Sequence, residues 1–324
     1  MAENTNISWC DATFNPWVGC VKVSDGCREC YAEAFMTRKG RWANTWGPAQ
    51  ATERIKTSDS NWRKPLAWNK QAAKEGKRMK VFCASLADVF ERNDKLIDWR
   101  WDLWELTKAT PNLDWLLLTK RPENVLDMTP HFWHKPEWHG YTGWPENVWI
   151  GTTTENQEQA EKRIPELLRI PARVRFLSCE PLLGTVDLSK PGMLTNPSPK
   201  WIAAHRNELK TDLNGIEYVG CMPVERLIHW VIAGGESGPS ARPMHPDWAR
   251  GLRDQCQAAG VAFHFKQFGE WVHESQIQEW HIERALGSKR MMAGDGYQYI
   301  QVGKHSAGRL LDGRTWDEFP EVNQ

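Results

Sequence analysis

Long hydrophobic runs, a surplus of charge of one sign and a dense cysteine framework are all missing from this chain of 324 residues. No apolar stretch approaches the roughly 18 residues that a membrane-spanning helix needs, so we expect no membrane partner. Lys plus Arg and Asp plus Glu both number 41, which excludes the global basic field that drives non-specific nucleic-acid binding. An electrostatic partner must therefore be recognised by local patches of charge.

Other absences indicate the cellular compartment. The N-terminal residues have neither the basic start nor the apolar stretch of a secretory signal. Eight cysteines in a chain of this length do not form the pattern of a disulfide scaffold. Both features predict a reducing, cytoplasmic compartment. Tyr and Phe are scarce beside Trp, at 5 and 10 against 20, and this ratio indicates many flat, amphipathic surfaces.

Six short apolar runs recur along the chain, and several of the segments between them have the pattern of helices. The runs are 81–84, 115–118, 148–150, 174–177, 230–233 and 261–265. The expected helices are 94–110, 155–168 with a break or kink near Pro165, and 246–259. Buried parallel strands that alternate with helices predict an α/β fold.

Polar side chains follow every one of the six runs, which distinguishes between two α/β architectures. In a barrel all strand ends converge on one mouth, where barrel enzymes place their sites, whereas a doubly wound sheet concentrates its chemistry at one switch point. We therefore predict a partial or full (β/α) TIM-type barrel over residues 1–270, with loop insertions at 41–80, 131–147 and 187–227. Residues 271–324 are predicted to form a C-terminal extension that packs on the barrel.

Cys20, Cys27 and Cys30 share one loop with the spacing C-x6-C-x2-C. Three thiolates this close can bind one metal centre. On a four-iron cluster they leave one iron open for an exogenous ligand, whereas a closed structural zinc site takes four ligands. Cys10 can supply the fourth, so the residues alone leave both an iron–sulfur cluster and a zinc ion open.

Together with several later motifs, this loop resembles the radical S-adenosylmethionine (SAM) superfamily, and most closely a phage-borne group of radical-SAM-like three-cysteine proteins of unknown function. A first short strand at 7–9 is expected before the loop. The matching stretches are W-C-D-A-T-F-N-P-W-V-G-C at 9–20, C-R-E-C-Y-A at 27–32, L-T-K-R-P at 118–122, S-C-E-P-L-L at 178–183, W-V-I-A-G-G-E-S-G-P at 230–239 and F-K-Q-F-G at 265–269. They are specific in combination, although each is weak alone.

The resemblance implies that Cys20, Cys27 and Cys30 hold a four-iron, four-sulfur (4Fe-4S) cluster whose open iron binds SAM. Reductive cleavage of SAM would give a 5′-deoxyadenosyl radical, and an electron donor such as a flavodoxin or ferredoxin would be the partner. Two features depart from the superfamily. Its usual spacing is C-x3-C-x2-C, and its Gly-Gly-Glu follows the second strand, whereas the one at 234–236 follows a much later run.

Candidate SAM contacts are polar or glycine residues at the ends of the runs. Glycines allow close approach of the backbone, a glutamate accepts from an ammonium or a ribose hydroxyl, and a lysine holds a carboxylate or phosphate. The candidates are Gly234, Gly235, Glu236, Ser237, Glu155, Asn156, Ser178, Glu180 and Lys120.

Three hypotheses of function follow from these features. The first is a SAM-dependent radical enzyme whose substrate the sequence does not identify, with a modified or damaged nucleotide or nucleic acid as one candidate. The second is a zinc-stapled nucleic-acid-binding protein without redox catalysis. The third is a cluster protein that has lost catalysis and serves as an interaction partner. The segment 41–80 combines four Trp residues with many Lys and Arg residues. This composition suits a nucleic-acid ligand, because aromatic faces stack bases while cations meet phosphates. A solvated helical surface with Trp packed beneath it explains the same pattern.

Overall fold

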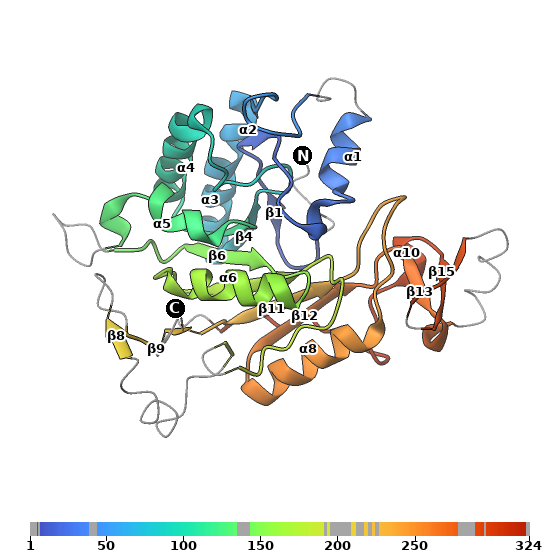
Figure 1. Cartoon of the computed structure of the whole chain (residues 1–324). Helices are drawn as coiled ribbons and strands as arrows, with labels where there is room; N and C mark the ends of the chain where they lie inside the picture. The colour runs from blue at the N-terminus through green and yellow to red at the C-terminus, as the bar shows by residue number, and fades with distance from the viewer. Residues whose placement is uncertain are drawn as a thin grey trace.

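A curved sheet of seven parallel strands is the frame of the computed structural model (Figure 1). In spatial order the strands are β1 (Ala12–Thr13), β4 (Met79–Cys83), β5 (Leu113–Thr119), β6 (Val148–Thr153), β7 (Arg175–Cys179), β11 (Trp230–Gly234) and β12 (Ala262–Gln267). Spatial order follows chain order, and each neighbouring pair is parallel. All six apolar runs are strands of this sheet, which confirms the predicted α/β class as a partial (β/α) barrel.

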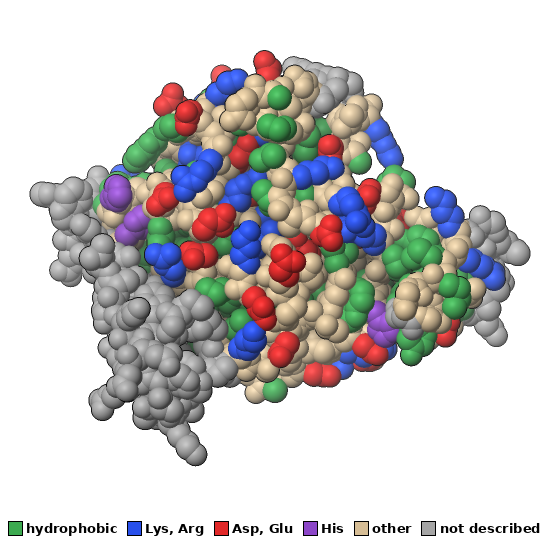
Figure 2. Space-filling model, in the orientation of Figure 1, with side chains coloured by type: hydrophobic (Ala, Val, Ile, Leu, Met, Phe, Trp, Pro, Cys, Tyr) green, Lys and Arg blue, Asp and Glu red, His purple; other side chains and the backbone are tan. Residues whose placement is uncertain are grey.

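The structure describes residues 5, 7–38, 44–134, 143–190, 193–194, 209–211, 217–219, 222–223, 227–277, 289–294 and 296–321. Parts of all three predicted insertions, 41–43, 135–142 and most of 191–226, lie outside the described residues, as does part of the C-terminal extension. In the described part of the chain, no helix is long and apolar enough to cross a membrane. On the face that Figure 2 shows, the side chains of Lys and Arg are interspersed with those of Asp and Glu.

Four helices of at least twelve residues connect the strands and cover the outer face of the sheet (Figure 1). They are α3 (Lys64–Glu75), α4 (Ile97–Ala109), α6 (Gln157–Arg169) and α8 (Pro246–Ala259). α8 has the predicted bounds and ends on Gly260 in the left-handed conformation that favours glycine. Of the break or kink predicted near Pro165, the break is absent, because α6 continues through Pro165 while Ile164, Leu167 and Leu168 pack on the core; the kink stays a prediction.

Shorter elements lie between and after these units. The short helices are α1 (Tyr31–Thr37), α2 (Asp59–Trp62), α5 (Val125–Met128) and α10 (Lys304–Ala307), and single 3-10 turns are η1 (Asp25–Cys27), η2 (Asp94–Leu96), η3 (Pro122–Asn124), η4 (His131–Trp133) and η6 (Glu274–Gln276). Three small antiparallel sheets are also present. The first pairs β2 (Trp17–Val18) with β3 (Ile55–Lys56). In the second, β9 (Glu217–Val219) lies between β8 (Leu209–Thr211) and β10 (Met222–Pro223), and in the third, β15 (Gln298–Gln301) lies between β13 (Trp271–His273) and β14 (Arg290–Met292).

Two hydrophobic layers lie on opposite faces of the sheet, as the alternation of strand side chains requires. In β4, Val81 and Cys83 pack with the layer under the helices, whereas Phe82 joins the concave layer. The concave layer is largely aromatic and consists of Trp9, Cys10, Phe82, Leu116, Trp149, Val174, Phe176, Trp230 and Ile232. It fills the inside of the partial barrel at the level of the strands.

Trp9 is the centre of this concave layer. Its ring lies 4.6 Å from that of Phe82, 6.2 Å from that of Trp230 and 6.4 Å from that of Phe176. The predicted strand at 7–9 is wrong, because these residues form a turn in which the amide of Cys10 donates to the carbonyl of Ile7, and the first strand begins five residues later. The turn directs the indole of Trp9 into the inside of the partial barrel.

The C-terminal segment covers the side where β1 and β12 do not pair. Asp317 forms an antiparallel bridge to His264 of β12, and the indole of Trp230 donates to the carbonyl of Glu318 at 2.9 Å. The ring of Phe319 lies 5.1 Å from that of Trp230 and under the ammonium of Lys80 at 4.6 Å. These contacts join residues 317–319 to β12 at one edge of the sheet and to β4 beside the other edge. The domain boundary at residue 270 stays a prediction.

We expect Trp9→Ala to lower the free energy of unfolding by about 3–5 kcal/mol, because it empties a closed aromatic site. Chemical denaturation measures the change. Trp101→Ala is the matched control, since that side chain is 49% exposed, against 2% for Trp9. Equal losses in the two variants would contradict the central position of Trp9.

Candidate functional site

A cavity of about 310 Å³ opens at the carboxyl ends of the parallel strands. Its wall includes residues that end or follow five strands of the sheet: Ala84 after β4, Lys120 after β5, Thr153 in β6, Ser178 in β7, and Gly235 after β11. Trp9 and Phe82 of the concave layer also line it, so the aromatic layer forms the floor. The site is therefore a polar mouth above an apolar base, as barrel sites are.

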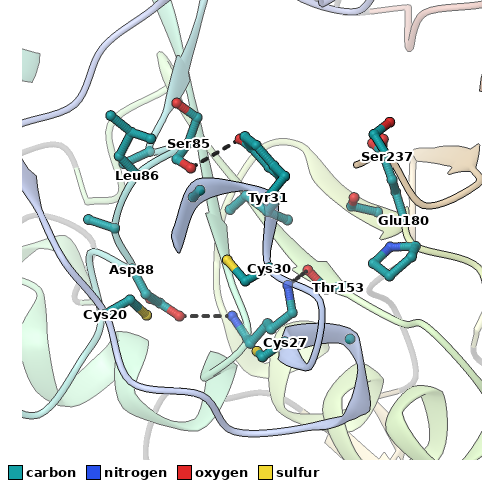
Figure 3. Close-up of a pocket in the computed structure, with 18 of the residues that line it drawn as sticks. Cys20, Cys27, Cys30, Tyr31, Ser85, Leu86, Asp88, Thr153, Glu180 and Ser237 are labelled. Carbon is teal, nitrogen blue, oxygen red and sulfur yellow. Dashed lines mark hydrogen bonds between the residues drawn. The ribbon is translucent and has the colours of Figure 1, made fainter. Parts of the chain in front are cut away.

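The three clustered cysteines all reach this cavity. Cys20 follows β2, Cys27 ends η1, and Cys30 is the residue before α1, and each lines the wall as a free thiol. Figure 3 shows them along one side of the cavity, with Glu180 and Ser237 across from them. The loop that the sequence marked as a metal-binding candidate thus faces the strand ends.

The carboxylate of Glu155 fixes the cysteine loop through hydrogen bonds. It accepts hydrogen bonds from the hydroxyl of Ser24 and from the amide of Gly26 at 3.2 Å, while Arg163 donates to its other oxygen at 2.7 Å. A side chain at position 26 would come within 2.9 Å of that carboxylate, so the contact requires glycine. Burial raises the pKa of Glu155, but Arg163 and Ser24 outweigh it and hold the pKa below its usual value.

A second carboxylate–arginine pair holds the loop from the side of β11. Glu236 accepts two hydrogen bonds from the guanidinium of Arg242, at 2.8 and 2.6 Å, and one from its amide at 2.9 Å. The same guanidinium donates to the carbonyl of Asp25 at 3.0 Å. The Gly-Gly-Glu turn therefore contacts the cysteine loop through Arg242.

Buried charges also surround Cys20. Arg121 donates to Asp88 at 2.6 Å and approaches the sulfur of Cys20 at 3.9 Å. Burial raises the pKa of the Cys20 thiol to about 12, although Arg121 opposes the shift. Burial also raises the pKa of Asp88, but Arg121 and hydrogen bonds from Thr119 and the backbone outweigh it and hold that pKa below its usual value.

Arg54 and Glu91 form a further buried pair below this loop. Their guanidinium and carboxylate meet at 3.0 and 2.6 Å, and Arg54 also donates to the carbonyl of Thr45 at 2.9 Å. Thr45 in turn accepts from the amide of Cys20 at 3.2 Å. The start of the cysteine loop is thus tied to the segment before β3.

The structure brings most of the predicted contact residues to one cavity. Lys120, Ser178, Glu180, Gly235, Glu236 and Ser237 line it together with the three cysteines. It does not bring the other three there: Glu155 lies behind the loop, Asn156 caps α6 by accepting from the amide of Gln159 at 3.0 Å, and Gly234 ends β11. Their predicted contacts with SAM stay predictions.

Gly234 has a different relation to the cavity. The ammonium of Lys266 and the carboxylate of Glu180 meet at 2.6 Å, although their strands β12 and β7 lie on opposite sides of β11. A side chain at Gly234 would lie 3.5 Å from both the carboxyl carbon of Glu180 and the Cβ of Lys266. These distances are ordinary van der Waals contacts, so the ion pair crosses the strand beside Gly234 without requiring glycine there.

Several wall residues were not among the predicted contacts. Trp46 lines the cavity, and it lies in the segment 41–80 that the sequence linked to base stacking. Lys304 of the C-terminal segment also lines the cavity. In the segment 41–80, Trp68 is a buried residue of α3, in agreement with the interpretation of Trp packed beneath a helical surface, and Trp42 lies outside the described residues. No local signal identifies Lys304, because only the fold brings it to the cysteines.

Three free thiols of one loop on one cavity wall are the ligand set that a 4Fe-4S cluster with one open iron takes. Among the described residues, no group of three or more His, Cys, Asp or Glu side chains is placed to hold one metal ion. Cys10, which the zinc alternative requires, is buried in the concave layer and does not line the cavity.

Comparison with known proteins identifies a family for almost the whole chain. Residues 4–320 match the family described as protein of unknown function (DUF5131). The chain belongs to this family. No curated protein matches the sequence.

Two solved structures of substituted spore photoproduct lyase are similar to this DUF5131 chain. One, with bound AdoMet and dinucleoside spore photoproduct, has a TM-score of 0.39 and 8% identity over 90% of this chain and 68% of the other. The second has a TM-score of 0.37 and 8% identity over 95% and 74%. None of these matches tests the resemblance to phage-borne proteins.

We expect Glu155→Gln to lower the free energy of unfolding by about 3–5 kcal/mol at pH 7, because it leaves Arg163 as a buried, unpaired charge. The folded pKa of Glu155 lies below the unfolded value of about 4.3. Its ionised form therefore stabilises the fold above that pH, and the contribution is lost as the pH falls through the folded pKa.

Denaturation of both proteins between pH 7 and pH 3 should therefore show a difference that shrinks in acid. Glu161→Gln is the matched control, because its pair with Lys190 is exposed and should change little. A difference that stays constant across this range would mean that the Glu155 carboxylate does not carry the stabilisation.

Proposed function

We propose that this protein is a radical SAM enzyme. The observation that carries the proposal is the placement of three cysteines from one loop along a cavity at the carboxyl ends of the strands, opposite a polar wall. When bound to these cysteines, a 4Fe-4S cluster would supply the electron that cleaves SAM to methionine and a 5′-deoxyadenosyl radical, which takes a hydrogen atom from the substrate. The partner would be an electron donor such as a flavodoxin or ferredoxin.

The protein's own groups would bind and orient SAM across from the cysteines. Glu180, beside its contact with Lys266, and Glu236, beside its contacts with Arg242, offer the remaining lone pairs of their carboxylates to an ammonium or ribose hydroxyls. Ser178 and Ser237 offer hydroxyls. Lys120 faces the cavity with the hydroxyl of Thr153 at 3.2 Å from its ammonium, so it can also meet an anionic group. Gly235 packs against the carbonyl of Phe268, where a side chain would come within 2.0 Å, so the turn itself requires glycine.

Exclusion of water is the second task of the protein in such chemistry, because a radical must meet only its substrate. The floor formed by Trp9 and Phe82 closes the cavity toward the inside of the barrel. Tyr31 stands at the rim with its hydroxyl donating to the carbonyl of Ser85 at 3.0 Å. Its ring and that of Trp46 give the wall two aromatic faces, which supports a nucleotide or nucleic acid, modified or damaged, as the substrate class.

Anaerobic reconstitution with iron and sulfide, followed by a reductant-dependent assay for 5′-deoxyadenosine from SAM, tests the proposal. We expect about four irons per chain and formation of 5′-deoxyadenosine, because three cysteines leave one iron open. Each of Cys20→Ala, Cys27→Ala and Cys30→Ala should abolish both results.

Cys10→Ala is the matched control, since this buried cysteine lies outside the cavity wall and should leave the iron content unchanged. Zinc in place of iron, with loss of the metal in Cys10→Ala, would contradict the proposal and support the zinc-stapled alternative. A bound cluster that does not cleave SAM after reduction would contradict the radical mechanism.

A further inference from the structure

Arg121 is a buried cation between the cysteine loop and the residues that follow β4. It stands directly after Lys120 at the end of β5, and its side chain is only 8% exposed. Its backbone amide donates to the hydroxyl of Thr119 at 2.9 Å, and Pro122 begins the next turn. The backbone at this position is therefore fixed on both sides.

The guanidinium of Arg121 makes three contacts that fix its plane. One nitrogen donates to Asp88 at 2.6 Å, and the other donates to the carbonyl of Val21 at 2.8 Å. The nitrogen that meets Asp88 also lies 3.9 Å from the sulfur of Cys20, within reach of an N–H···S hydrogen bond. Figure 3 shows Asp88 and Cys20 side by side at this corner of the cavity.

Asp88 is itself held in place, so it fixes the guanidinium as a rigid support. Its carboxylate accepts from the hydroxyl of Thr119 at 2.7 Å, from the amide of Lys120 at 3.1 Å and from the amide of Phe90 at 3.0 Å. Its side chain is only 7% exposed. An arginine held in this way needs no rearrangement to donate to a thiolate at position 20.

We propose that Arg121 is a positioning residue that donates an N–H to the sulfur of Cys20 when Cys20 ligates the cluster, and thereby raises the reduction potential of the cluster. The inference rests on the proposed function. Reduction adds one electron from an external donor, and the added negative charge is shared with the thiolate sulfurs. A hydrogen bond and a positive charge in a buried site stabilise the reduced state more than the oxidised state.

Asp88 acts in the opposite direction, because its negative charge offsets that of Arg121. The pair therefore predicts two shifts of opposite sign. Arg121→Met removes the donor and the positive charge and should lower the potential, while Asp88→Asn removes the negative charge and should raise it. Arg121→Lys keeps the charge without the planar fork and should lie between Arg121→Met and the wild type.

Redox titrations of the reconstituted proteins, followed by the electron paramagnetic resonance (EPR) signal of the reduced cluster, measure these shifts, and iron counting accompanies each titration. For Arg121→Met we expect at least a tenfold change in the reduction equilibrium, which is 59 mV for one electron, toward the oxidised cluster. Arg92→Met is the matched control, because Arg92 pairs with Asp127 on the exposed surface and should leave the potential unchanged.

The outcomes separate this inference from the function on which it rests. A wild-type protein that binds no iron–sulfur cluster overturns both. A wild-type cluster whose potential is the same in Arg121→Met and Asp88→Asn overturns the role of Arg121 alone. If Arg121→Met does not retain a cluster, the other two variants decide. A raised potential in Asp88→Asn together with a lowered potential in Arg121→Lys supports the inference. Any other pair of shifts overturns it.

Discussion

The buried carboxylate of Glu155 is the contact on which the position of the cysteine loop depends. It binds Ser24 and Gly26 of the loop on one oxygen and Arg163 of α6 on the other, so the loop is fastened to the barrel at the end of β6. Removal of one partner from such a buried pair destabilises the fold, because it leaves the other partner as a buried charge without a counter-ion. The loop is short of apolar side chains that could anchor it, so ionic contacts take that role.

Arginine–carboxylate pairs repeat this arrangement around the loop. Arg121 binds the carbonyl of Val21, Arg242 binds that of Asp25, and each is paired with a carboxylate from a strand end. The charges of the mouth therefore stand above an aromatic floor centred on Trp9. The floor is a buried hydrophobic layer, while the rim positions the thiols, and Lys120 and Glu180 line the cavity. This division follows from the strands, whose carboxyl ends meet at one mouth.

The sequence predicted the frame better than the site. Periodicity located six strands and the bounds of α8, because buried parallel strands are short apolar runs, and it placed three cysteines in one loop. It predicted the first strand at 7–9, where the structure has a turn that places Trp9 in the aromatic layer. Such a turn has no periodic pattern in the sequence. It listed Glu155 among the candidate SAM contacts, which stays a prediction, but it did not show that this carboxylate binds Ser24 of the loop, 131 residues away in sequence. Contacts of that range, like those of Lys304 with the cavity, arise only from the fold.

On the proposed function, SAM binds the open iron of a cluster held by Cys20, Cys27 and Cys30. The EPR spectrum of the reduced, reconstituted protein during titration with SAM tests this binding. We expect an iron–sulfur signal whose g-values change as SAM is added and reach a limit at one SAM per cluster. A spectrum that SAM leaves unchanged, or a protein that gives no iron–sulfur signal after reconstitution, would contradict it.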